Sequence, residues 1–177
     1  MSQLNLGTRI VFKVFGAVAA LALLAGFTFA PAGIAYADDG TAAGPEGKPL
    51  EKMFKYEQQW LVKQQERLSK AGEFAAKVQT FIDELKAKGK DTAALEAALA
   101  AYNQQIATAQ GQHDTAANIL GTHAGFDADG HVTDRAQAKQ TVKDARQALA
   151  DAHKTLQQAG QDLRAALKAY RDAFKTK

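Results

Sequence analysis

Histidine is the residue type in this sequence best suited to bind a transition metal, because a neutral imidazole ring is a good ligand for zinc and copper. No two histidines stand four residues apart, so the helical zinc motif does not occur. His113 is the most informative of them, since it falls on the apolar spacing of its segment, level with Gln64 in a preceding helix. We expect a core histidine hydrogen-bonded to Gln64, with a metal site formed by His113 and His153 as the alternative. The histidines are His113, His123, His131 and His153.

A short segment around Gly130 is similar to part of a calcium-binding loop. Aligning Gly130 with the glycine of an EF-hand loop puts Asp127 and Asp129 at the third and fifth ligand positions. The first ligand position is then Gly125 and the twelfth is Ala136, neither of which has a side-chain oxygen. We therefore expect a turn that leads into a helix, with calcium binding as the less favoured reading.

The sequence shows no catalytic pattern. Nothing resembles a nucleophile with its base, and no glycine-rich phosphate loop occurs. Glu57 falls on the apolar spacing of its helix, but it has no second carboxylate at the spacing that glycosidases use. We expect Glu57 to pair with a lysine or to reach solvent, and we expect the protein to be neither an enzyme nor a cofactor carrier.

These side chains must be positioned by long helices, of which the last, over residues 134–175, has the clearest pattern. Alanine recurs there every seven residues, and a larger apolar residue follows four places after each of the first five alanines. Spacings of four and three keep one apolar face toward neighbouring helices and predict a left-handed supercoil. The repeating alanines are Ala138, Ala145, Ala152, Ala159, Ala166 and Ala173, and the larger residues are Val142, Leu149, Leu156, Leu163 and Tyr170.

Two further helices, over residues 49–88 and 91–120, continue the same spacing. Pro49 suits a first helical turn, Gly89 supplies a left-handed cap, and Asp91 is a suitable N-cap for the second helix. A link this short forces the second helix to run antiparallel to the first. The sequence therefore predicts an all-α fold, an antiparallel three-helix bundle with long heptad-patterned, coiled-coil-like helices over residues 49–177.

The connection over residues 122–133 is expected to cap one end of this bundle. We expect Phe126 to pack on the end formed by Leu50 and its neighbours on the first helix. If that packing is poor, the aromatic side chains there become an exposed apolar patch, which marks a binding surface. The predicted interaction surface consists of Met53, Phe54, Trp60 and Phe126.

The first 37 residues read as a secretory signal peptide. Two basic residues precede an apolar run over residues 14–29, and the small-residue site Ala35-Tyr36-Ala37 follows. We expect cleavage after Ala37, leaving residues 38–48 as a flexible leader rich in glycine, alanine and aspartate. The alternative is an uncleaved membrane anchor, because the apolar run is nearly long enough to span a bilayer.

Charge and composition restrict the partners of the remaining chain. All 19 acidic residues lie after residue 37, whereas only two of the 22 lysines and arginines precede it, so residues 38–177 carry a net charge of about +1. A near-neutral surface gives no support to nucleic-acid binding, which needs a basic face. The chain has no cysteine, so an exported domain depends on packing rather than disulfides.

In its layout, a signal peptide followed by a small, charged, glutamine-rich helical domain, the chain resembles bacterial periplasmic helical chaperones of the Spy and CpxP kind. The LTxxQ motif of those proteins does not occur here, so no residue role is carried over. We expect an exported, non-enzymatic protein-interaction or chaperone-like module, periplasmic or extracellular, that binds a protein partner or its own copies. The alternative is a small metal-binding protein with histidine and aspartate ligands. Contact with a membrane is expected only through an uncleaved signal peptide.

Overall fold

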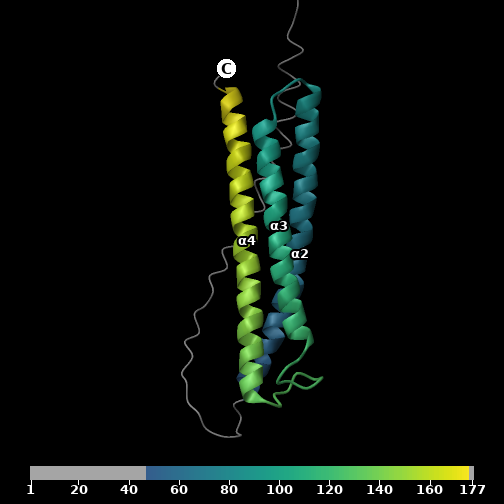
Figure 1. Cartoon of the computed structure of the whole chain (residues 1–177), viewed down its shortest axis with the longest axis vertical. Helices are drawn as coiled ribbons and strands as arrows, with labels where there is room; N and C mark the ends of the chain where they lie inside the picture. The colour runs from purple at the N-terminus through teal and green to yellow at the C-terminus, as the bar shows by residue number, and fades with distance from the viewer. Residues whose placement is uncertain (1–46, 176–177) are drawn as a thin grey trace, which may run out of the picture. The chain divides into compact units, whose positions relative to one another are not determined.

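The computed structural model describes residues 47–175, which form three helices: α2 (Gly47–Ala87), α3 (Ala93–Gly121) and α4 (Arg135–Lys175). Helices α2 and α4 run in the same direction and α3 runs back beside both (Figure 1), so the predicted all-α three-helix bundle is confirmed. The predicted signal peptide, residues 1–37, and residues 38–46 of the predicted leader lie outside the described residues. Within the described part, no helix combines the length and apolarity needed to cross a membrane.

The helix boundaries differ from the predicted ones by no more than two residues. The largest consequence is at the start of α2, where Gly47 and Lys48 are helical rather than part of the leader. Pro49 is then the third helical residue, a place where its missing N–H has no helical acceptor and costs nothing. The start of α2 also has tertiary support, because Gly47 packs beside Val132 of the α3–α4 loop.

The turn between α2 and α3 is short, and its residues cap the end of one helix and the start of the next. Gly89 has a φ of 66°, and the N–H groups of Gly89 and Lys90 donate to the carbonyls of Lys86 and Leu85. This is the Schellman arrangement, as the glycine predicted. The N-cap of α3 is Thr92, one residue after the predicted Asp91. The Thr92 side chain makes no capping bond and its hydroxyl donates to Glu96, whereas the Asp91 carboxylate accepts a bond from the Ala93 N–H.

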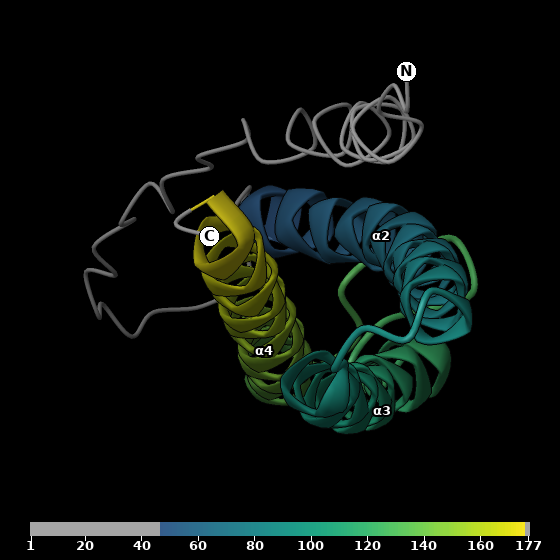
Figure 2. The same cartoon turned by 90° about the horizontal axis from the view of Figure 1, so that it is seen from above.

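The packing of α3 on α4 depends on alanine. Along both helices the alanines at the contact are fully buried, and such small side chains allow two helix backbones to approach closely. The heptad periodicity and its left-handed supercoil stay predictions, although Figure 2 shows the three helices inclined to one another around a common axis. The fully buried alanines are Ala109 and Ala116 on α3 and Ala138, Ala145, Ala152 and Ala159 on α4.

Larger apolar residues gather in two clusters near the ends of the bundle. One joins Val78, Ile82 and Leu85 of α2 to residues of α3 and the second half of α4. The other joins Phe54 to the end of α3, the loop and the start of α4. Between them the core is thinner, with Leu68 packed against alanines. The centre of the bundle is therefore where polar side chains enter.

The α3–α4 loop folds back on the bundle, as predicted for Phe126. The Phe126 ring is buried and stacks on Phe54, with ring centroids 4.2 Å apart. Gly125 makes this possible, since its φ is 83° and its carbonyl accepts bonds from Thr133 and Asp134. Asp134 in turn caps α4 by accepting a bond from the Gln137 N–H.

Replacing Gly125 with alanine should destabilise the protein strongly. A Cβ atom there would lie 2.1 Å from the Ala138 nitrogen and 2.6 Å from the Asp134 carbonyl oxygen, both backbone atoms. We expect Gly125→Ala to lower the free energy of unfolding in urea by roughly 3 kcal/mol or more. The matched control is Gly72→Ala in α2, where no atom lies within 4 Å of the new Cβ. That variant should gain about 0.5–1 kcal/mol, and equal effects of the two changes would contradict this account of the loop.

Candidate functional site

Three polar side chains lie buried among the helices, one of them at the end of the bundle that holds Phe54 and the other two nearer its centre. Glu57 and Gln64 come from α2, two turns apart, and His113 comes from α3. Their positions on the apolar spacing of the helices cause their burial, because that spacing turns each of them toward the neighbouring helices. Buried polar groups need partners inside the protein, so their contacts decide what they can do.

Glu57 is the most unusual of the three. It is only 1% exposed, and its Oε1 atom lies 3.8 Å from Nε of Arg146 on α4. Its second oxygen, Oε2, is buried without a hydrogen-bond partner among the described residues. The expectation of a lysine partner or a solvent-exposed carboxylate is therefore wrong. Glu57 instead faces α4, where Arg146 is next to the buried Ala145 and reaches across the contact.

Burial changes the acidity of this carboxyl group. Removal from water raises the pKa of Glu57 from 4.5 to about 7, even though the positive charge of Arg146 acts in the opposite direction. At 3.8 Å the pair is too long for a good hydrogen bond, so Arg146 compensates only part of the desolvation. Glu57 can therefore gain or lose a proton near neutral pH, which an ordinary glutamate does not do.

Gln64 and His113 form the hydrogen bond that the sequence predicted. Nε2 of Gln64 donates to the Leu149 carbonyl of α4 at 2.9 Å, and Nδ1 of His113 lies 3.4 Å from Oε1 of Gln64. Because an amide oxygen only accepts, this contact assigns the proton to Nδ1 of His113. Burial lowers the pKa of His113, so the ring is kept neutral. Gln64 thereby joins all three helices at the centre of the bundle.

His153, the second residue of the predicted metal alternative, has a different environment. Its Nδ1 atom lies 3.4 Å from Nη1 of Arg67, and a guanidinium group only donates. Burial and the positive charge of Arg67 both lower the pKa of His153. A metal cation at this nitrogen would compete with Arg67, so these contacts do not favour a site shared with His113. Within residues 47–175 no three metal-binding side chains are grouped so that they could hold an ion.

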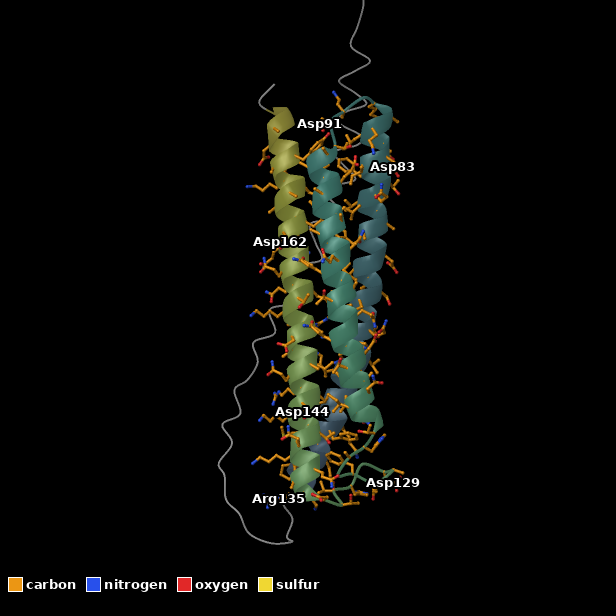
Figure 3. All side chains as sticks on the ribbon, viewed as in Figure 1. Asp83, Asp91, Asp129, Arg135, Asp144 and Asp162 are labelled. Carbon is orange, nitrogen blue, oxygen red and sulfur yellow. The ribbon has the colours of Figure 1, made fainter. Side chains whose placement is uncertain are left out.

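The loop that resembled a calcium site is a turn. One oxygen of Asp127 accepts bonds from the N–H groups of His131 and Asp129, and these bonds, that from His131 foremost, lower the pKa of Asp127. Asp129 lies in the loop at this end of the bundle (Figure 3). Glu51 of α2 accepts a bond from the Val132 N–H, so the loop is also tied to α2.

The predicted interaction surface needs a correction. Phe54 and Phe126 stack on each other inside one end of the core, 1% and 6% exposed, and therefore do not form an exposed patch. Met53 is half-buried at the edge of this cluster, and Trp60 is half-buried further along α2. Tyr56, which the prediction missed, is 46% exposed. Its spacing of three residues from Met53 and four from Trp60 places it on their helix face, so the sequence contained the signal.

The exposed faces of the helices carry a repeated hydrogen bond. In five places a glutamine side chain donates to an aspartate four residues later, three of them along α4. Asp144 and Asp162, which accept two of these bonds, lie on the outer surface of α4 (Figure 3). Pairs of this kind stabilise a helix locally. These five glutamines therefore have a structural role on the helix surface.

Comparison with known proteins does not extend these observations. No protein-family model matches the chain, and no match was found among curated proteins or solved structures. The resemblance of layout to periplasmic helical chaperones therefore remains an expectation. Functional conclusions depend on the side chains described above.

Replacing Glu57 with glutamine should stabilise the protein at neutral and higher pH. The folded state holds a proton on Glu57 that the unfolded chain releases above its ordinary pKa of 4.5, so this group costs stability as the pH rises from 4.5 to about 7. The full loss is about 3 kcal/mol. Glutamine resembles the neutral carboxyl group and escapes this cost.

We expect Glu57→Gln to exceed the wild type in urea-unfolding free energy by about 1–3 kcal/mol at about pH 8, with the difference vanishing near about pH 4.5. Glu66→Gln, at an exposed site of the same helix, is the control and should show no such pH dependence. A variant less stable than the wild type at the higher pH would mean that the Arg146 contact outweighs the cost of burial.

Proposed function

We propose that this chain is an exported, non-enzymatic helical-bundle protein that binds apolar segments of other protein chains, as an interaction or chaperone-like module of the cell envelope. One observation carries the proposal: Tyr56 stands exposed on α2 beside the half-buried Met53 and Trp60. We call these three residues the α2 patch. The signal-peptide-like order of residues 1–37 supports export.

The composition of the α2 patch fits a protein partner. Tyrosine, tryptophan and methionine are enriched at protein interfaces, and the two aromatic side chains provide large contact areas with few rotatable bonds. Methionine also adapts its shape to different partners. Exposed lysines stand nearby on α2, among them Lys52, Lys55 and Lys63. A patch of this kind suits apolar segments with acidic neighbours.

Substitution of the α2 patch should reduce binding of unfolded chains. We expect the wild type to suppress the light scattering of chemically reduced insulin, and Tyr56→Ser with Trp60→Ser to lose roughly threefold or more of that suppression. Tyr56→Ser alone should lose less, and, because that side chain is exposed, it separates lost binding from lost folding.

Val62→Ser is the matched control for this assay. Val62 is 62% exposed on the same helix, but it lies about 120° around the helix from Tyr56. An effect of Val62→Ser equal to that of the patch variants would show that general surface hydrophobicity, rather than the α2 patch, is responsible. Absence of any suppression by the wild type would remove the chaperone-like function.

Export predicts a processed chain. When the full sequence is expressed in a bacterium that has a secretory pathway, the protein recovered outside the cytoplasm should begin at Asp38, which intact-mass measurement and N-terminal sequencing detect. Replacement of Ala35 and Ala37 by large residues should block this cleavage and leave the chain with the membrane fraction. Recovery of the unprocessed wild type from the cytoplasm would contradict export.

A further inference from the structure

Glu57 lies where the first half of α2 meets α4, and its neighbours on α2 are aromatic. Phe54 is three residues before it and Trp60 three residues after it, so each lies within one helical turn of Glu57. Phe54 belongs to the apolar cluster that also holds Phe126 and the start of α4. Any change at Glu57 therefore acts directly on the packing of this end of the bundle.

The packed bundle accommodates the two protonation states of Glu57 unequally. The ionised carboxylate has one oxygen without a hydrogen bond and the other 3.8 Å from a guanidinium nitrogen. Such a charge is poorly compensated inside a core. The neutral carboxyl group loses far less on burial, and Arg146, about one third exposed, keeps contact with water when its partner is neutral. Neutral Glu57 thus favours the packed state, and ionised Glu57 favours a state in which water reaches it.

Few other charges face Glu57. From α4 the facing charge is Arg146. On α3 the residues at this level are alanines, Ala116 and Ala117, because Leu120 packs with Phe54 on one side and His113 contacts Gln64 on the other. From the loop, the ring of His123 lies 5.3 Å from that of Phe54, and His131 contacts Glu51. The effects of these histidines must be separated from that of Glu57 by experiment.

We infer that Glu57 is a proton-controlled latch: the neutral carboxyl group keeps the first half of α2 packed on α4 and the loop, and ionisation releases that half and exposes Phe54 and Phe126. The second half of α2 stays in place, because Val78, Ile82 and Leu85 are held by the other apolar cluster. The released aromatic rings enlarge the α2 patch. The claim that this movement regulates binding of other chains rests on the proposed function. The movement of α2 itself does not depend on that function.

Trp60 is the only tryptophan of the chain and stands one turn from Glu57, so it reports on the latch directly. We would measure acrylamide quenching of Trp60, and hydrogen-exchange protection of residues 50–61 and 78–88, at about pH 5 and about pH 8.5. In the wild type, quenching should increase at the higher pH, and protection of residues 50–61 should fall at least about tenfold relative to residues 78–88.

Three variants decide the assignment. Glu57→Gln should remove the pH-dependent change and stay closed at both pH values. Arg146→Gln should move the midpoint of the change to higher pH, because Arg146 favours the ionised carboxylate. His123→Gln should leave the Glu57-dependent change in place. The latch is overturned if Glu57→Gln retains the full change, if His123→Gln abolishes it, if Arg146→Gln leaves the midpoint unmoved, or if both halves of α2 lose protection equally.

The same proteins in the reduced-insulin assay separate the latch from the proposed function. Opening of α2 together with stronger suppression of scattering at the higher pH supports both. Opening without any suppression of scattering supports the latch and contradicts the chaperone-like function. Suppression by the wild type with no opening of α2 contradicts the latch and leaves the α2 patch as the binding surface.

Discussion

The close contact of α3 with α4 is the constraint on which the rest of this bundle depends. Alanines with no exposed surface recur along both helices, and side chains this small allow the two backbones to approach closely. Helix α2 completes the bundle with larger side chains that pack over this pair, in clusters near the two ends. Between the clusters the apolar core is smaller, and Gln64 and His113 are buried there, whereas Glu57 is buried at the end that holds Phe54.

The buried polar side chains make the stability of the protein respond to pH in two opposing ways. Glu57 costs stability as the pH rises from 4.5 to about 7. His113 has a lowered pKa, so it costs stability as the pH falls below its ordinary value of 6.5 and the unfolded chain takes up a proton. The two groups differ in their contacts, since Gln64 accepts a bond from His113 whereas one oxygen of Glu57 has no partner. Of these two buried groups, Glu57 is therefore the one whose burial is less well compensated by hydrogen bonds.

Much of the fold could be predicted because its signals are local. The seven-residue repeat predicts the helices, Gly89 predicts the turn, and the polar His113 on an apolar spacing predicts its bond to Gln64 once the helices are counted back from that turn. The pairing of Glu57 with Arg146 could not be predicted in this way. It depends on how far α4 is shifted along α2, and the long α3–α4 loop leaves that shift open. The packing of Phe126 on this end of α2 was predicted, but the complete burial of Phe54 beneath it depends on the path of the loop, which the φ of Gly125 fixes.

The glutamine–aspartate pairs on the outer faces have a consequence for the conditions that the protein tolerates. A neutral amide donates to each of these aspartates, so the contact does not depend on attraction between two full charges. Dissolved salt weakens exposed ion pairs by screening, but it has much less effect on a hydrogen bond to a neutral group. For a protein proposed to work outside the cytoplasm, where ionic strength varies with the surroundings, these helices keep their surface contacts in both dilute and concentrated salt.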